Sequence, residues 1–407
     1  MKLTKKITTT CCLAVIAAAT LFSGCGGSDG NNDKNGSDAG VQSTDAPEAT
    51  DGGDEGKDDK TLTAGTIKEA YEKLFSTGVA INSWQLADQD VLELVKKNFS
   101  SITMENEMKP DYILDHDKTL EAEDGLPVIN MENVDKIMNM ADDAGLKMRG
   151  HTLVWHSQTP EWLFHVDYDE DKEYVDRDTM LARMEAYIKR VLTFCNENHP
   201  GLVYAWDVVN EAMSDDQDGG LRTDSPWYKP VGEDYIEKAF EFERDYADKE
   251  TKLFINDYGL LSPAKRDTMY DVATELYAKG LIDGIGMQSH YTMDDFKKDD
   301  LEQALFKFAQ IDGIELQLTE LDLHNTDDSD EGLKKQADTY KSIFDVLVDL
   351  DGKDLANVTN VTFWGLNDEC TWLTGFRKET SYPLLFDAGN QPKPCYYSIL
   401  EAAANIE

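Results

Sequence analysis

Short apolar runs alternate with longer amphipathic stretches from residue 61 to the end of the chain. Apolar side chains recur every three or four positions in 180–195 and again in 340–350, which is the spacing of one helix face. The short apolar runs predict eight strands, at 79–83, 101–104, 147–152, 203–209, 252–256, 284–289, 314–319 and 361–365. Strands that alternate with helices form a parallel sheet. Eight such units predict a single α/β domain over 61–407, a TIM (β/α)8 barrel.

The first 24 residues have the pattern of a signal peptide. Lys2, Lys5 and Lys6 precede an apolar run over 11–22 that is too short to span a bilayer. The run ends at Cys25 in the sequence LFSGC, which resembles the bacterial lipoprotein box, where the cysteine is lipidated and becomes the new N-terminus. We therefore expect an exported protein with a signal peptide at 1–24 and a lipid on Cys25 that holds it at the cell surface. Ordinary secretion is the alternative.

Residues 25–60 are expected to form an acidic, disordered tether behind the lipid. Positions 26–60 hold ten acidic residues, three lysines and almost nothing apolar, so the segment cannot bury enough surface to fold. The whole chain has a formal net charge of −41, of which about −37 belongs to residues 61–407. Such an acidic surface repels phosphate groups. Nucleic acid is therefore excluded as a partner, and contact with a membrane is expected only through the lipid anchor.

Three cysteines remain in the predicted domain, at Cys195, Cys370 and Cys395. An odd number does not make a disulfide framework, and the paired spacing of a zinc site is missing. Whether Cys370 and Cys395 pair with each other stays open, because pairing depends on their distance in the fold. We expect no metal and no cofactor, and a monomer.

Polar and aromatic side chains stand where the predicted strands end. A TIM barrel builds its site from these carboxyl ends, whereas the alternative fold, a two-lobed α/β binding protein, does not need such residues at nearly every strand end. The residues concerned are Glu105, Asn106 and Lys109 after the second strand, His151, Trp155, His156 and Gln158 after the third, Asp207, Asn210 and Glu211 after the fourth, Asn256, Asp257 and Tyr258 after the fifth, Gln288 and His290 after the sixth, Glu320 and Asp322 after the seventh, and Trp364 and Trp372 after the eighth.

Two of these residues, Glu211 and Glu320, are glutamates at the ends of strands that should be buried in the barrel wall. A carboxylate in that position must be paired or functional. The fourth and seventh strands face each other across the barrel mouth, so the two carboxylates should face each other across a cleft. Such a pair is typical of a glycosidase: one carboxyl group protonates the leaving oxygen, and the other attacks the anomeric carbon or activates water.

The neighbouring residues are typical of a sugar site. A sugar ring has apolar faces and a rim of hydroxyl groups, so flat aromatic rings and amide, histidine or lysine donors hold it. The rings are supplied by three tryptophans, Trp155, Trp364 and Trp372. Trp206, in contrast, is expected to point into the barrel wall. His156 and His290 lack the spacing of metal ligands, which favours hydrogen-bonding roles for both.

Several longer segments resemble the signature motifs of glycoside hydrolase family 10, the endo-β-1,4-xylanases. The three strongest are GHTLVWHSQ at 150–158, WDVVNEA at 206–212 and LTELD at 318–322. Supporting segments are TMENEMKP at 103–110, GMQSH at 286–290, FWG at 363–365 and QPKP at 391–394. They stand in the family's order, and the resemblance runs from about residue 66 to 402. It implies a TIM-barrel enzyme that cleaves xylan and xylo-oligosaccharides with retained anomeric configuration and without a cofactor.

The resemblance also implies a role for each residue. Glu211 is the general acid/base and Glu320 the nucleophile, which retention requires to lie about 5–5.5 Å apart. Four neighbours are expected to support this pair, namely Asn210 at the sugar 2-hydroxyl, Asp207 on the acid/base side, His290 beside Glu320, and Asp322 behind His290. The substrate contacts are expected to be Glu105, Asn106, Lys109, His151, Trp155, Gln158, Gln288, Trp364 and Trp372. Residues 213–220, an acidic and glycine-containing insert, are expected to form either a mobile loop that sets the preference on the leaving side or no more than a solvated loop, and we favour the latter.

Two further functions fit parts of the sequence. A β-glucanase, or a mixed xylanase and cellulase, would keep both glutamates and differ only at the tryptophan lid and around Lys109 and Gln158. A lipoprotein sugar-binding component of a transporter would fit the lipid box and the tether. It would bind sugar without cleaving it, so it would not need two opposed glutamates.

Overall fold

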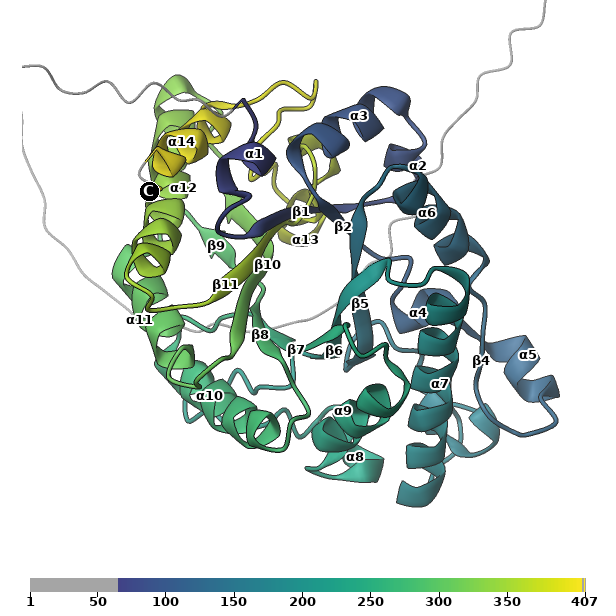
Figure 1. The fold of residues 1–407 in the computed structure, drawn as a ribbon. Helices are drawn as coiled ribbons and strands as arrows, with labels where there is room; N and C mark the ends of the chain where they lie inside the picture. Colours follow the sequence, from purple (N-terminus) through teal and green to yellow (C-terminus); the bar gives the residue numbers. More distant parts are fainter. Residues whose placement is uncertain (1–64, 405, 407) are drawn as a thin grey trace, which may run out of the picture. The chain divides into compact units, whose positions relative to one another are not determined.

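The computed structural model describes residues 65–404 and 406, and in this part of the chain eight parallel strands close into a barrel (Figure 1). The barrel strands are β1 (Ser76–Ile81), β2 (Ser101–Met104), β5 (Lys147–Trp155), β6 (Val203–Asn210), β7 (Lys252–Asp257), β8 (Gly284–Met287), β10 (Glu315–His324) and β11 (Val358–Phe363). They pair in chain order, and β11 pairs with both β10 and β1, which closes the ring. The predicted TIM barrel is confirmed.

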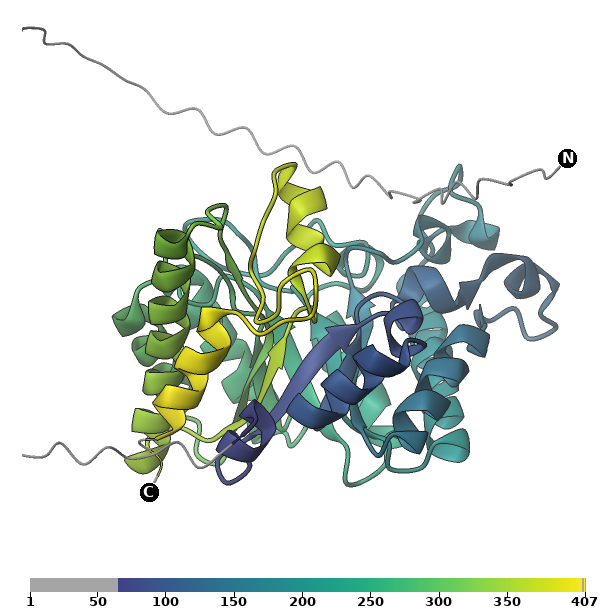
Figure 2. The same cartoon turned by 90° about the horizontal axis from the view of Figure 1, so that it is seen from above.

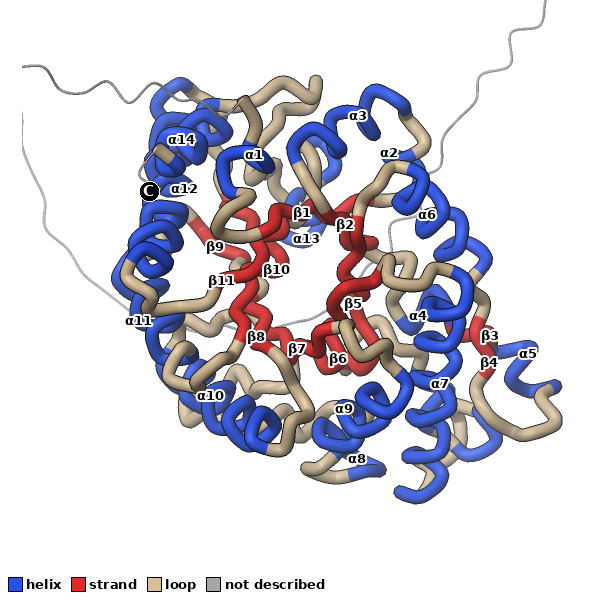
Figure 3. The backbone as a smooth tube through the Cα atoms, viewed as in Figure 1, coloured by secondary structure: helices blue, strands red, loops and turns tan. Residues whose placement is uncertain are grey.

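Helices surround the ring of strands on the outside (Figure 3). The longer ones are α3 (Gln89–Asn98), α6 (Glu132–Asp143), α7 (Arg177–Asn198), α9 (Tyr235–Tyr246), α10 (Pro263–Ala278), α11 (Lys298–Phe308), α12 (Asp330–Gly352) and α14 (Pro394–Ala403). The helical spacing predicted over 180–195 lies within α7, and that over 340–350 lies within α12. Asp176 caps α7 by accepting a hydrogen bond from Thr179 N, and Ser329 caps α12 in the same way through Gly332 N.

Shorter elements fill the connections. They are α1 (Ile67–Tyr71), α2 (Ser83–Leu86), β3 (Leu114–Asp115), β4 (Val128–Ile129), α4 (Pro110–Ile113), α5 (His116–Glu121), α8 (Tyr228–Val231), β9 (His290–Thr292), α13 (Trp372–Arg377) and 3-10 turns at Glu161–Phe164, Val166–Tyr168 and Asp368–Cys370. Figure 2 shows the yellow-green α13 at one end of the barrel, where the strands terminate, and the dark purple α1 at the other. No helix among the described residues combines the length and the apolar character needed to cross a membrane.

Strand β10 extends furthest beyond its predicted end. The strand expected at 314–319 continues as β10 to His324, because Leu321 and Leu323 remain fully buried beyond the polar Thr319 and Glu320. The sequence places the end of the strand between Thr319 and Glu320, but both side chains are buried and share a hydrogen-bond partner, Asn256. The extra residues pair with β9, and this register sets Asp322 opposite His290.

A tryptophan and a glycine fit against each other inside the barrel wall. Trp206 on β6 is fully buried, as expected, and lies over Gly150 on the neighbouring β5. A Cβ atom at position 150 would lie 2.3 Å from the indole ring, closer than any van der Waals contact allows. Gly150 therefore provides the space in which Trp206 packs.

The remaining predictions concern residues outside the described part or the cysteines. The expected signal peptide at 1–24 and the tether at 25–60 with its lipidated Cys25 lie outside the described residues. Cys195, Cys370 and Cys395 are all free thiols, so the pairing left open for the last two is not formed.

Candidate active site

The predicted nucleophile, Glu320, is enclosed by partners at the carboxyl end of the barrel. Its Oε1 accepts a hydrogen bond from Asn256 Nδ2 at 2.9 Å, and its Oε2 lies 3.2 Å from His290 Nε2. On the far side of the imidazole, His290 Nδ1 lies 3.0 Å from Asp322 Oδ1. Asp322 Oδ2 in turn accepts a hydrogen bond from Trp372 Nε1 at 2.8 Å. Glu320, His290 and Asp322 thus form a continuous row.

The charges in this row are set by the neighbours. Burial lowers the pKa of His290, but the charge of Asp322 and the hydrogen bonds to Asp322 and Glu320 outweigh it and raise that pKa to about 10. Burial likewise raises the pKa of Glu320, yet the charges of His151 and His290 bring it below its ordinary value. At neutral pH the row therefore holds a His290 imidazolium beside an ionised Glu320.

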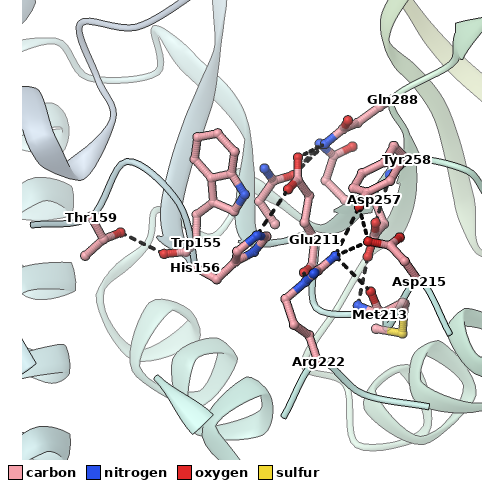
Figure 4. Close-up of polar contacts among 12 residues, drawn as sticks. Trp155, His156, Thr159, Glu211, Met213, Asp215, Arg222, Asp257, Tyr258 and Gln288 are labelled. Atoms are coloured by element: carbon pink, nitrogen blue, oxygen red, sulfur yellow. Dashed lines mark hydrogen bonds and ion pairs between the residues drawn. The ribbon is translucent and has the colours of Figure 1, made fainter. Parts of the chain in front are cut away.

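The predicted acid/base, Glu211, directly follows β6 and takes the left-handed backbone conformation, with φ of 57°. Its Oε1 accepts a hydrogen bond from Gln288 Nε2 at 3.0 Å, and His156 Nε2 lies 3.8 Å from Oε2 (Figure 4). Burial lowers the pKa of His156, so its imidazole is neutral at neutral pH. Glu211 is thus set between a neutral ring and an amide donor.

Three amides connect the two glutamates. Gln288 Nε2, which donates to Glu211, also lies within hydrogen-bond distance of Asn210 Oδ1 at 3.2 Å. Asn256 Nδ2, which donates to Glu320, also donates to Asn210 Oδ1 at 2.9 Å. Asn210 Nδ2 is buried and has no hydrogen-bond partner among the described residues. An unused buried donor between two carboxylates is the group that a substrate hydroxyl would satisfy.

A second group of predicted residues lies beside this centre. Lys109 Nζ donates to Gln158 Oε1 at 2.9 Å and to Asn106 Oδ1 at 3.2 Å, and it lies 5.1 Å from the centre of the Trp155 ring. Burial lowers the pKa of Lys109, although Glu320 and Glu105 oppose the shift. These side chains offer donors, acceptors and an aromatic face in one place, as a sugar rim and ring require.

A row of rings connects that group to the nucleophile. His151 lies 6.4 Å from Trp155 and meets Trp364 edge to face at 5.1 Å. His290 lies 6.4 Å from Trp364 and 5.0 Å from Trp372, in both cases edge to face. The structure thus brings together the aromatic residues that the strand ends predicted.

Asp207 contacts a buried arginine and a histidine. We expected it to tune the acid/base side, but its carboxylate accepts two hydrogen bonds from Arg149, at 2.7 and 2.8 Å, and lies 3.0 Å from His151 Nδ1. Both Arg149 and Asp207 are fully buried. The Arg149 charge keeps the pKa of Asp207 below its ordinary value despite burial. Asp207 therefore orients His151, which lies on the side of Glu320.

The insert after Glu211 is exposed to solvent over residues 215–218, as expected, and it is also anchored. Asp215 accepts hydrogen bonds from Arg222 Nη2 at 2.9 Å and from the Tyr258 hydroxyl (Figure 4). It accepts a third from Lys265 Nζ at 2.8 Å. Burial raises the pKa of Asp215, but these three hydrogen bonds lower it to about 2. Asp215 is thus a half-exposed residue that also anchors the loop.

Sequence reasoning missed the roles of several of these residues. Asn256 at the end of β7 is among the strand-end residues, but nothing in the sequence assigns it a role. Arg149 lies inside β5 and Arg222 lies eleven positions after Glu211 in a loop, and no spacing in the sequence relates either to its partner. In the described residues no three His, Cys, Asp or Glu side chains are arranged to hold a metal ion.

Comparison with known proteins places the whole domain in one family. The model for glycosyl hydrolase family 10 matches residues 66–402. An endo-1,4-beta-xylanase B of Butyrivibrio fibrisolvens is 44% identical over 343 residues, which are 83% of this chain and 53% of that protein. The chain thus spans about half the length of this relative. A putative endo-1,4-beta-xylanase of Caldicellulosiruptor saccharolyticus is 42% identical over 307 residues, which are 72% of this chain and 96% of that protein.

Solved structures give the same result. The CBM22-1 and GH10 modules of a Clostridium thermocellum endo-1,4-beta-D-xylanase, complexed with xylohexaose, superpose with a TM-score of 0.75 at 36% identity, over 83% of this chain and 68% of that one. An intracellular xylanase of Thermoanaerobacterium saccharolyticum, in a mutant complexed with xylotriose, gives 0.72 at 36% identity, over 82% and 97%.

Proposed function

The chain belongs to glycosyl hydrolase family 10, and we propose that it is an endo-1,4-β-xylanase that works by the retaining mechanism. The observation that carries the proposal is the charge arrangement around the two glutamates. Glu320 is held as a carboxylate against the His290 imidazolium, whereas Glu211 lies against an amide and a neutral His156. One carboxyl group is thus prepared to attack, and the other, which lies outside that charged row, is assigned the acid/base role.

The first step forms a covalent intermediate. Glu320 attacks the anomeric carbon, the bond to the leaving sugar breaks, and the Glu211 proton goes to the departing oxygen. The Asn210 amide, with its unused Nδ2 donor, is suited to bind the sugar 2-hydroxyl, a contact that strengthens as positive charge develops on the ring.

The second step releases the product. Once Glu320 is esterified its negative charge is gone, and Glu211 is left as a carboxylate because it has given up its proton. Glu211 then takes a proton from water as the water attacks the anomeric carbon, and the ester bond to Glu320 breaks. The free Glu320 carboxylate is again stabilised by His290 and Asn256, and Glu211 regains its proton for the next cycle.

The surroundings support xylose as the sugar. Lys109, Asn106, Gln158 and Trp155 offer a polar rim beside a ring face. Trp372 is fixed by its hydrogen bond to Asp322, which limits its movement away from the nucleophile. A fixed ring above this position would clash with the hydroxymethyl arm of glucose, and xylose does not have that arm.

Release of reducing ends from soluble xylan, β-glucan and carboxymethyl-cellulose tests the proposal, with wild type and Glu320→Gln. We expect wild type to cut xylan to short oligomers and the variant to be inactive, and NMR of the initial product should show retained anomeric configuration. Cleavage of β-glucan at a similar rate would favour the glucanase alternative. Binding of xylo-oligosaccharides without cleavage would favour a sugar-binding lipoprotein and refute the enzyme.

We also propose that the protein is exported and anchored through a lipid on Cys25. The support is the basic start, the short apolar run and the LFSGC sequence. A Cys25→Ala variant should move from the membrane fraction to the soluble exported fraction, and mass spectrometry of the wild-type N-terminus should show the lipid. A wild-type protein that is free in the medium with an unmodified Cys25 would refute this part of the proposal.

A further inference from the structure

The backbone of Glu211 is held from both sides. Its N–H donates to Asn256 O at 2.8 Å, and its carbonyl oxygen accepts a hydrogen bond from Arg222 Nε at 3.1 Å. Glu211 has a φ of 57°, which is unfavourable for a residue that carries a Cβ atom. Such a conformation persists only when the surroundings fix it. The direction of the Glu211 side chain therefore depends on these two hydrogen bonds.

Arg222 is itself fixed by a cluster of charges. Its Nη2 donates to Asp215 Oδ2 at 2.9 Å and to the Tyr258 hydroxyl at 3.1 Å. Lys265 Nζ holds the other Asp215 oxygen at 2.8 Å and lies 3.0 Å from Asp257 Oδ1. Lys265 is 5% exposed and Asp257 is fully buried, so the cluster is rooted in the protein interior. The guanidinium is thus held rigidly behind the Glu211 carbonyl (Figure 4).

The loop that carries these groups is closed at both ends. Met213 N donates to Asp257 Oδ2 at 2.9 Å, and Ser214 N donates to Gly220 O at 2.8 Å. Gly220 N donates to Thr268 Oγ1 on α10, also at 2.9 Å. The loop leads back to Arg222. The length of the loop and its hydrogen bonds together place the Arg222 guanidinium next to the Glu211 peptide.

We propose that Arg222 is a positioning residue for the acid/base: it aims the Glu211 carboxyl group by fixing the Glu211 peptide. The inference rests on the proposed function, because it assigns a task to Glu211. Arg222 does not contact the substrate in this scheme. Loss of its hydrogen bond frees the peptide to leave the left-handed conformation, which moves the carboxyl group away from the leaving oxygen.

This role predicts a dependence on the leaving group. A sugar leaving group needs protonation, so its departure depends on where the Glu211 proton lies. A 2,4-dinitrophenolate departs without a proton, so its release does not. The value of kcat/KM reports the glycosylation step for both substrates, whichever later step limits kcat.

The experiment compares xylotetraose with 2,4-dinitrophenyl β-xylobioside for wild type and Arg222→Met. We expect kcat/KM for xylotetraose to fall by about 10- to 100-fold, the cost of a misplaced catalytic group, and kcat/KM for the aryl substrate to fall far less. Arg244→Met is the matched control. Arg244 likewise joins a carbonyl, Leu281 O, to an aspartate, Asp283, both at 2.9 Å, but at the opposite end of the barrel. Equal losses with both substrates in Arg222→Met would overturn the inference.

Two further variants separate the possible failures. Glu211→Ala should lose xylotetraose cleavage far more than aryl cleavage. Equal losses there would refute the role of Glu211 and the proposed mechanism with it, whereas a selective loss in Glu211→Ala but not in Arg222→Met would overturn only the role of Arg222. If Arg222→Met does not fold, Asp215→Asn tests the role of Arg222 in its place, because it removes the anchor of Arg222. It should give a smaller loss of kcat/KM that is again selective for xylotetraose. An unselective effect in Asp215→Asn would count against the inference.

Discussion

The substitution Asp322→Asn isolates the charge that the His290 imidazolium provides to Glu320. Asp322 Oδ2 accepts the Trp372 indole N–H at 2.8 Å, and Asp322 Oδ1 lies 3.0 Å from His290 Nδ1. An asparagine can accept from Trp372 with its carbonyl oxygen and donate to His290 Nδ1 with its amide. The imidazole then carries its single proton on Nε2 and still donates to Glu320. The hydrogen bond remains, whereas the positive charge is lost.

The size of the effect follows from the distance. His290 Nε2 lies 3.2 Å from Glu320 Oε2, and a full charge at that distance contributes about 5 kcal/mol at an effective dielectric constant of ~20. The imidazolium charge is spread over the ring, so this figure is an upper bound. Loss of about half of it would lower the ionised fraction of Glu320, and with it kcat/KM, by about 100-fold on the acidic side of the pH profile.

The pH dependence of kcat/KM distinguishes loss of the His290 charge from other effects of the substitution. In wild type, the acidic limb of kcat/KM reports ionisation of the nucleophile, whose pKa His151 and His290 lower against the effect of burial. Without the His290 charge the pKa of Glu320 rises, so the acidic limb moves to higher pH in Asp322→Asn. The measurement is kcat/KM for an aryl xylobioside between pH 3 and 8.

Trp372→Phe is the control, because it removes the other contact of Asp322 and leaves the carboxylate charge in place. We expect this variant to raise KM through the loss of part of the lid and to keep the wild-type acidic limb. An acidic limb that is unchanged in Asp322→Asn, or a loss confined to KM, would refute the assignment of an imidazolium beside Glu320.

Three further predictions concern the barrel. Asp207→Ala leaves the buried Arg149 charge unpaired and should lower the free energy of unfolding by about 3–5 kcal/mol in denaturant titrations, and a loss under 1 kcal/mol would contradict a dry ion pair. Gly150→Ala sets a Cβ atom 2.3 Å from the Trp206 ring and should cost about 1–3 kcal/mol in the same assay, with wild-type stability as the contrary result. Burial raises the pKa of Asp257 to about 7, so the folded protein keeps a proton on this carboxyl group that the unfolded chain releases near pH 4. The wild-type protein therefore loses stability as the pH rises from about 4 to about 7. Asp257→Asn should therefore gain stability relative to wild type from pH 4 to pH 7, and a difference that does not change with pH would argue against the raised pKa.

The sequence pattern predicts the barrel because each strand is an apolar run and each outer helix has one apolar face. It is least accurate where a strand enters the polar interior. At β10 the polar Thr319 and Glu320 suggest an end, yet the strand continues to His324, and Asn256 on β7 supplies a hydrogen-bond partner for both side chains. The periodicity of apolar residues describes the apolar surface of a strand. It does not reveal a hydrogen-bond partner that lies elsewhere in the chain.

In the candidate site, too, some residues could be predicted from the sequence and others could not. Residues at strand ends could be predicted, because a parallel barrel brings all carboxyl ends together whatever their separation in the chain. The partners of Asp207 and of the Glu211 carbonyl could not, since Arg149 lies within a strand and Arg222 within a loop. Their positions depend on the strand register and on loop closure, which no short motif encodes.

The amide bridge between the two glutamates bears on attempts to change the enzyme by engineering. Asn256 donates to both Glu320 and Asn210, and Gln288 bonds both Asn210 and Glu211. Substitutions on the two sides of the cleft therefore share hydrogen-bond partners, and their effects on activity should not add. Libraries that vary one side at a time would miss compensating pairs, whereas joint variation of Asn256 and Gln288 would sample them. Double-mutant cycles across this bridge would measure how strongly leaving-group protonation and nucleophilic attack are coupled.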